Sequence, residues 1–186
     1  MHEQLLVRLC APTLAGMKTG SLFRCPAPDR QTLLRMLRGW NAALAEKGLC
    51  ILPLGEKQGG ALLYLFRPKL LERDLRAPGA ACLLAERGYC VGEAGMYLAQ
   101  LVRRLKADAE FPHEIGLFLS YPPEDVRGFI AHSANRSDGC KLVGTWRVYG
   151  DVDAAKKTFE KYRKCTESYC RQWSDGVPLV RLAVTA

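Results

Sequence analysis

The sequence predicts an α/β (or α+β) domain in which helices pack on a mixed sheet of about five to six strands. Residues 115–184 follow the order strand, helix, strand, helix, strand (βαβαβ), which usually gives parallel neighbours through right-handed crossovers. Earlier in the chain, two apolar runs separated by a Gly-rich segment are typical of a hairpin. The chain has 186 residues, of which 48% are apolar and 25% charged, so we expect one globular domain over residues 1–186.

Hydrophobic periodicity predicts the elements of the first half of the chain. Asp29 is a candidate N-cap, the apolar residues after it repeat at helical spacing, and Gly48 suits the end of that helix. Pro68 ends the second hairpin strand. The expected helices are residues 2–10, 29–47, 80–87 and 93–106, and the expected strands are residues 21–25, 50–54 and 61–67.

The pattern of the second half predicts alternating strands and helices. Residues 115–119 are nearly all apolar, as expected for a strand buried on both faces. Pro122 and Pro123 favour the first turn of a helix, and Asp151 is a candidate N-cap for a long one. The expected order is strand 115–119, helix 122–132, strand 142–149, helix 151–174 and strand 179–184.

Charge and hydropathy limit the location and the partners of the protein. No apolar run approaches the roughly 20 residues of a membrane span, and the run 5–7 is too short for a signal peptide. We therefore expect a soluble, cytoplasmic protein. The net charge of +8 is compatible with an anionic partner but identifies none.

Cysteine is abundant, with eight residues in the chain. In a reducing compartment they are expected to be free thiols, ligands or redox groups rather than a disulfide framework. There is no Cys-x-x-Cys pair and there are only three histidines, so the spacing is wrong for a zinc module. We expect most of them to be small buried apolar residues, and the sequence identifies no cofactor.

Three segments carry a family resemblance. They are CAPTLAGMKTGSLFRC (10–25), FPHEIGLFLSYPPEDVRGFI (111–130), and the stretch from Cys140 through GTWRVYGD to KCTESYC (164–170). Together they resemble a bacterial family of unknown function, domain-of-unknown-function family 3793, seen mostly in anaerobic Firmicutes. The resemblance covers essentially the whole chain and implies a complete family member, but it implies no activity. A typical member has Gly at the position of Ser120.

The first candidate site consists of Ser120, Tyr121, Tyr149 and Asp151, which follow the expected strands 115–119 and 142–149. If those strands are parallel neighbours, the four residues meet at a sheet edge where α/β folds bind ligands. Alternatively, they are ordinary turn and cap residues. The helix N-termini at this edge carry four carboxylates, which disfavour a phosphate there: Glu124, Asp125, Asp151 and Asp153.

Two further segments contain candidate ligand residues. Lys18 and Thr19, among glycines, would suit an anion, although Met17 stands where a P-loop needs Gly, and a structured loop is the alternative. His113 beside Glu114 suggests a base or a ligand. Adjacent strand residues point to opposite faces, however, so Glu114 can simply begin the strand while His113 lies in a loop.

The long helix near the C-terminus suggests two other kinds of site. Cys140 with Cys165 or Cys170 is a candidate redox or metal group, and Lys164 would favour a thiolate at an exposed Cys165. Core packing is the alternative for both helix cysteines. Four basic residues form a stripe that suits nucleic-acid phosphates, or a solvated face paired with Glu160 and Glu167: Lys157, Lys161, Lys164 and Arg171.

These patterns lead to three functional hypotheses. The first is a small-ligand-binding or accessory domain whose site lies near Tyr121 and Tyr149, closed by the loop that carries Lys18. The second is a thiol-based redox or metal-handling protein, and the third is a nucleic-acid-binding protein. The sequence contains no catalytic triad, nucleophile elbow, dinucleotide loop or paired-carboxylate motif, so it assigns no reaction.

Overall fold

The computed structural model describes residues 2–57, 59–90, 92–107, 111–133 and 139–185. The chain divides into two units, which we describe separately. The first unit comprises Met1–Leu71 and Tyr162–Ala186, and the second comprises Glu72–Lys161. The fold mixes helices and strands and is 61% helical. None of the helices in the described ranges is both long and apolar enough to cross a membrane.

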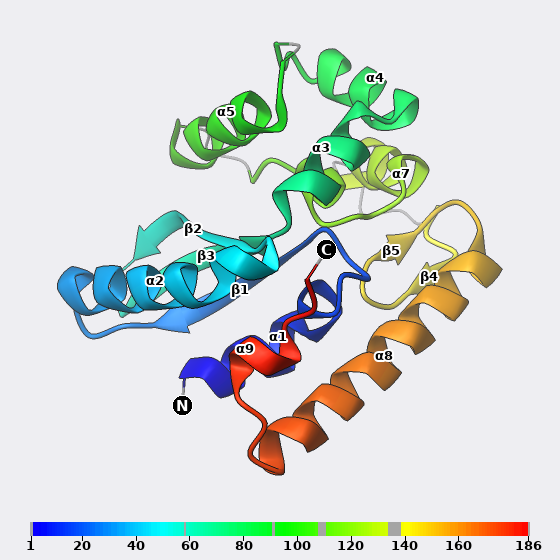
Figure 1. Cartoon of the computed structure of the whole chain (residues 1–186). Coiled ribbons are helices and arrows are strands. Elements are labelled where there is room, and N and C mark those ends of the chain that lie inside the picture. Colours follow the sequence, from blue (N-terminus) through cyan, green and yellow to red (C-terminus); the bar gives the residue numbers. More distant parts are fainter. Residues whose placement is uncertain (1, 58, 91, 108–110, 134–138, 186) are drawn as a thin grey trace. The chain divides into compact units, whose positions relative to one another are not determined.

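The first unit is built on an antiparallel sheet with the strand order β1-β3-β2 (Figure 1). Its strands are β1 (Gly20–Pro26), β2 (Cys50–Lys57) and β3 (Gly60–Phe66), which confirms the predicted hairpin. Gly60 has a φ of 157°, and a Cβ there would overlap the carbonyl oxygen of Cys25. The hairpin turn therefore needs glycine where it passes β1.

Helices α1 (His2–Leu14), α2 (Arg30–Leu44) and α9 (Leu179–Leu182) share one hydrophobic core with this sheet. The predicted cap of α2 is confirmed, because Asp29 accepts hydrogen bonds from the backbone N and the hydroxyl of Thr32, at 2.7 and 2.9 Å. The helix buries the apolar face that its spacing predicts: Leu33, Leu37, Trp40 and Leu44.

Helix α1 is longer than predicted and passes through Pro12. It ends in a Schellman motif, in which Gly16 has a φ of 73° and the backbone N–H groups of Gly16 and Met17 donate to Thr13 and Pro12. The carbonyls of the last turn of α1 can accept further hydrogen bonds, and the side chain of a buried arginine donates them.

That arginine is Arg67, which directly follows β3 and is 1% exposed. Its guanidinium donates to the carbonyls of Thr13, Leu14, Lys47 and Val184, at 2.6 to 3.0 Å. Desolvation lowers the pKa of Arg67, yet guanidinium stays charged in proteins. One buried cation thus joins the end of α1, the chain before β2 and the C-terminal segment.

The second unit is mainly helical, and its four predicted helices are present. The elements that belong to it in whole or in part are α3 (Pro68–Arg76), α4 (Pro78–Glu86), α5 (Ala94–Ala107), α6 (Ile115–Phe118), α7 (Pro123–Ser133), β4 (Leu142–Val143), β5 (Arg147–Val148) and α8 (Val152–Ser174). Strands β4 and β5 form an antiparallel hairpin. Helix α8 begins in the second unit and ends in the first.

The predicted βαβαβ arrangement is wrong. Residues 115–119 form helix α6 and its cap, residues 179–184 contain helix α9, and residues 142–149 fold back as the β4–β5 hairpin. The strands of the described residues form two separate sheets, one of three strands and one of two. Neither has the five to six strands expected of a single mixed sheet. A short run that is buried on all sides has no period, so its sequence does not distinguish a helical turn from a strand.

Ser120 closes α6 in a conformation that favours glycine, with a φ of 60°. Its hydroxyl donates to Asp74 at 3.3 Å. Replacement by Gly and replacement by Ala both remove that hydroxyl. The difference in stability between the two variants therefore measures the cost of the left-handed backbone conformation for a residue with a Cβ. We expect Ser120→Gly to have a free energy of unfolding about 1 kcal/mol higher than Ser120→Ala, measured by urea denaturation. Equal stabilities would show that this residue leaves the left-handed region in solution.

Candidate functional site

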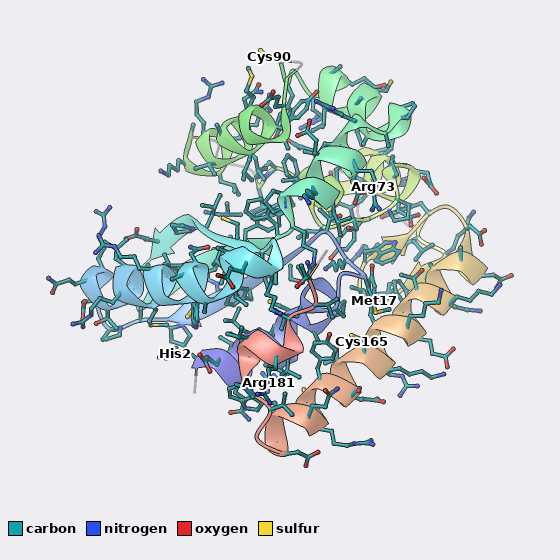
Figure 2. The ribbon with its side chains drawn as sticks, in the orientation of Figure 1. His2, Met17, Arg73, Cys90, Cys165 and Arg181 are labelled. Carbon is teal, nitrogen blue, oxygen red and sulfur yellow. The ribbon has the colours of Figure 1, made fainter. Side chains whose placement is uncertain are left out.

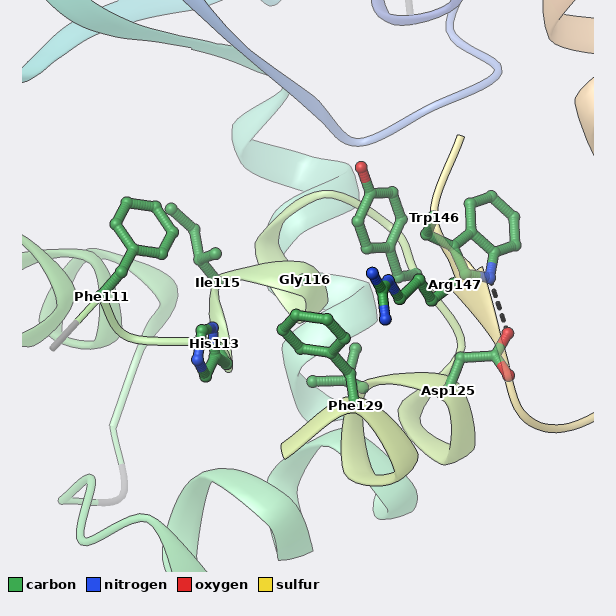
Figure 3. Close-up of a pocket in the computed structure, with 10 residues that line it drawn as sticks. Phe111, His113, Ile115, Gly116, Asp125, Phe129, Trp146 and Arg147 are labelled. Carbon is green, nitrogen blue, oxygen red and sulfur yellow. Dashed lines mark hydrogen bonds between the residues drawn. The ribbon is translucent and has the colours of Figure 1, made fainter. Parts of the chain in front are cut away.

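The second unit contains a pocket of about 360 Å³ between α6, α7 and the β4–β5 hairpin (Figure 3). Aromatic and aliphatic side chains form most of its wall. The lining residues are Phe111, His113, Ile115, Gly116, Tyr121, Asp125, Val126, Phe129, Trp146 and Arg147. A concave, mainly apolar wall with a few polar groups is the usual character of a small-molecule site, and this volume is at the small end of the range.

A close approach between α6 and α7 shapes one wall of the pocket. A Cβ at Gly116 would lie 2.8 Å from Val126 and 3.1 Å from Tyr121, so only glycine fits at this point. Phe129 lies one turn further along α7 than Val126. The ring of His113 meets the ring of Phe129 edge-on, with centroids 4.8 Å apart.

Asp125 fastens the hairpin to α7. It is 3% exposed, and its Oδ2 accepts a hydrogen bond from Trp146 Nε1 at 2.7 Å (Figure 3). Its Oδ1 accepts from the backbone N–H groups of Tyr149 and Gly150, each at 2.7 Å. This carboxylate is therefore more than the dipole-balancing residue that the sequence suggested, because it fixes the position of the pocket's tryptophan.

Trp146 lines the pocket from the β4–β5 hairpin. Its ring stacks on Tyr121 with centroids 5.0 Å apart. The ring of Phe159, a residue of α8, meets it edge-on with centroids 4.5 Å apart. Burial raises the pKa of Tyr121, so the phenol stays neutral at physiological pH, and it donates a hydrogen bond to the carbonyl of Thr145. The indole thus contacts two other aromatic rings and is hydrogen-bonded at its nitrogen before any ligand arrives.

The two members of the His113–Glu114 pair have separate surroundings. His113 lines the pocket, whereas Glu114 is fully buried and accepts a hydrogen bond from the hydroxyl of Tyr89 at 3.0 Å. Arg87 and Arg104 lie 3.6 and 3.8 Å from the Glu114 carboxylate. Desolvation first, and the Glu114 charge second, raise the pKa of Tyr89. Glu114 is thus held by Tyr89, Arg87 and Arg104 and does not line the pocket that His113 lines.

The chain matches a known protein family over nearly its whole length. A family model described as "Protein of unknown function (DUF3793)" matches residues 6–183. The chain belongs to the DUF3793 family. The searches of curated proteins and of solved structures gave no match. Membership confirms the resemblance seen in the sequence.

The structure of this DUF3793 chain places only one of the four predicted strand-end residues in the pocket, Tyr121. Tyr149 stacks on His132 with centroids 5.2 Å apart. Asp151 is exposed and caps α8. The hydrogen bonds that its carboxylate accepts from backbone N–H groups, foremost that of Ala154, lower its pKa. Ser120 is tied to Asp74. The predicted sheet edge does not exist, because the strands that would form it are helical or fold back.

Lys18 and Thr19 belong to the first unit of the DUF3793 chain and are buried, at 8% and 1% exposure. Desolvation lowers the pKa of Lys18 to about 8 and raises the pKa of Cys10 to about 12. The sequence left open an anion-binding loop and a structured loop, and the burial of both side chains, Lys18 and Thr19, favours the structured loop.

The Lys18 amine predicts a pH-dependent stability. Its pKa is about 8 in the folded chain and 10.5 ordinarily, so above pH 8 the unfolded chain binds more protons and the free energy of unfolding rises with pH. From pH 9 upward the Cys10 thiol, which ionises only when unfolded, opposes this rise. We expect a gain of about 1 kcal/mol between pH 8 and 9 in urea titrations. Lys18→Met should abolish this gain and Lys69→Met, at an exposed site, should keep it; equal slopes in all three proteins would contradict the assignment.

The eight cysteines of the DUF3793 chain are free thiols. The expectation that most of them are buried is wrong, because only Cys10 and Cys25 are buried, two are exposed and four are half-buried. Cys140 lies in the second unit and donates to the carbonyl of Leu142. Cys165 and Cys170 lie on the part of α8 that belongs to the first unit, and Figure 2 labels Cys165 there. Cys165 is half-buried and burial raises the pKa of its thiol, so the exposure that a thiolate beside Lys164 would require is not found. Within the described ranges, no group of three or more His, Cys, Asp or Glu side chains is arranged to hold a metal.

The basic residues of α8 in this family member are solvent-exposed, and Glu167 pairs with Arg163 at 2.6 Å. Eight of the ten lining residues were not predicted as ligand residues, among them the aromatic residues Phe111, Phe129 and Trp146. Their signal was the concentration of aromatic residues between positions 111 and 149, which becomes a site only when α6, α7 and the hairpin close around them.

Proposed function

We propose that this chain is a small-molecule-binding protein whose ligand carries a planar apolar group held in the α6–α7–hairpin pocket. The observation that carries the proposal is the pocket wall itself, in which the rings of Tyr121, Phe129 and Trp146 surround a space of about 360 Å³. Ring faces and edges of this kind bind planar apolar groups, and each aromatic pair adds about 0.5–1.5 kcal/mol beyond the area it buries.

Preorganisation also supports binding. Trp146 is fixed by Tyr121, Phe159 and Asp125, so a ligand need not order this side chain when it enters. Avoiding that loss of side-chain freedom is worth about 0.5–1.5 kcal/mol for each immobilised residue. The thiol and nucleic-acid hypotheses lack comparable support, since the former has no ligand cluster in the described residues and the latter has only an exposed basic helix face.

The test uses chemical-shift mapping with indole-3-acetamide, a planar probe that is uncharged. We expect shifts in the backbone amides of Gly116, Phe129 and Arg147 and a dissociation constant raised about fivefold or more by Phe129→Ala, which removes one ring contact. Val143→Ala is the control, because Val143 lies on the same hairpin, is 69% exposed and does not line the pocket. Shifts confined to other regions would contradict the proposal.

A further inference from the structure

We infer that the natural ligand of this pocket is an aromatic carboxylate, whose ring lies among Tyr121, Phe129 and Trp146 and whose carboxylate meets Arg147. The inference rests on the proposed pocket and adds the sign of the ligand's charge. It follows from a comparison of the two charged side chains that line the pocket, Asp125 and Arg147.

The negative side chain is already engaged. Asp125 accepts three hydrogen bonds, from Trp146 Nε1 and from the backbone N–H groups of Tyr149 and Gly150, all at 2.7 Å. A carboxylate has about four acceptor positions, so little of its capacity remains for a ligand cation. Its charge strengthens the hydrogen bonds that attach the β4–β5 hairpin to α7.

The positive side chain, Arg147, is exposed, whereas Asp125 is buried. Arg147 begins β5, lines the pocket, and extends toward Phe129 (Figure 3). Its side chain is exposed, and among the residues that the structure describes the guanidinium has no hydrogen-bond or ion-pair partner, so within that part of the chain its five N–H donors are open to solvent and to a ligand. A planar guanidinium matches the two oxygens of a carboxylate, which gives both attraction and orientation.

The acidic residues that were expected to repel an anion do not change this conclusion. That expectation concerned a sheet edge that the described strands do not form. Of its four carboxylates only Asp125 lines the pocket, where three donors already bind it, and Glu124, Asp151 and Asp153 do not line it. A carboxylate also suits a small pocket better than a phosphate, because it adds fewer atoms beside the ring. Ring contacts thus supply affinity, while Arg147 selects the charge.

Three probes with one ring system test the charge preference by calorimetry: indole-3-acetate, indole-3-acetamide and tryptamine. We expect the acetate to bind about five- to tenfold more tightly than the amide, and tryptamine to bind most weakly. Equal affinities for acetate and amide, or tightest binding of tryptamine, would overturn the charge assignment and leave the pocket in place. If none of the three probes binds, both the pocket function and this inference fail.

Variants separate Arg147 from the net positive charge of the chain. Arg147→Gln should remove the preference for acetate over amide while the affinity for the amide changes less than twofold. Arg127→Gln is the matched control, since Arg127 is an exposed α7 arginine that does not line the pocket. This control should keep the full preference. A preference that persists in Arg147→Gln would assign the selectivity to another group and overturn the inference.

Discussion

Replacing Arg67 by Met is expected to unfold the first unit under conditions in which the parent chain is folded. The side chain supplies hydrogen bonds to four carbonyls, at 2.6 to 3.0 Å, from three separate stretches of chain. Hydrogen bonds to a charged group are worth about 1.5–3 kcal/mol each, and buried acceptors left unpaired are themselves costly. The expected loss of about 5 kcal/mol or more is comparable with the whole stability of many domains.

The consequence reaches both ends of the first unit. Arg67 Nη2 joins the carbonyls of Leu14 and Val184, and the backbone N–H of Val184 donates to the same Leu14 carbonyl at 3.0 Å. Without the guanidinium, the C-terminal segment loses its cation and the last turn of α1 loses the partner of its negative dipole end. Deuterium exchange should therefore increase at residues 13–14 and 184 even before global unfolding.

Urea denaturation followed by far-UV circular dichroism measures the effect. Arg67→Lys should give an intermediate loss, because one ammonium cannot reach four carbonyls that a planar fork spans. Arg24→Met is the control: Arg24 is exposed on β1, and its replacement should change the free energy of unfolding by less than about 0.5 kcal/mol. A denaturation curve for Arg67→Met that matches this control would contradict the structural role.

The elements that the sequence predicted correctly have local signals. Helix α2 has a capping residue at Asp29 and apolar residues at a helical period that continues for about three turns, from Leu33 to Leu44. The β2–β3 hairpin has two apolar runs around Gly59 and Gly60, whose positive φ values show why glycine is there. Each signal lies within the element or next to it, so no knowledge of the remaining chain was needed.

The elements that were predicted wrongly depend on distant contacts. All four residues of α6 are buried, so the run has no polar face to reveal a period. Residues 142–149 alternate, but their turn is decided by Asp125, which binds Trp146 and the two backbone N–H groups after β5. Tyr121 and His113 were singled out for the wrong geometric reason, and the pocket that contains them required the tertiary arrangement of α6, α7 and the hairpin.

Replacing Asp125 by Asn is expected to loosen the β4–β5 hairpin and to open the pocket. The amide can still accept from the backbone N–H groups of Tyr149 and Gly150, but its nitrogen would face Trp146 Nε1, which is also a donor. The variant loses charge assistance at three hydrogen bonds and leaves one buried donor unpaired. We expect the free energy of unfolding of the second unit to fall by about 2–4 kcal/mol.

The same substitution should reduce binding through Trp146 without changing any group that is expected to touch the ligand's carboxylate. In Asp125→Asn we expect the affinities for indole-3-acetate and indole-3-acetamide to fall by a similar factor, because the ring wall moves while Arg147 is retained. Glu124→Gln is the matched control, since it removes a neighbouring charge from the same turn of α7 at an exposed position. Denaturation and calorimetry on both variants measure these effects. If Glu124→Gln weakens stability and binding as much as Asp125→Asn does, the charge at the start of α7 is responsible, and the buried hydrogen bonds of Asp125 are not what holds the pocket together.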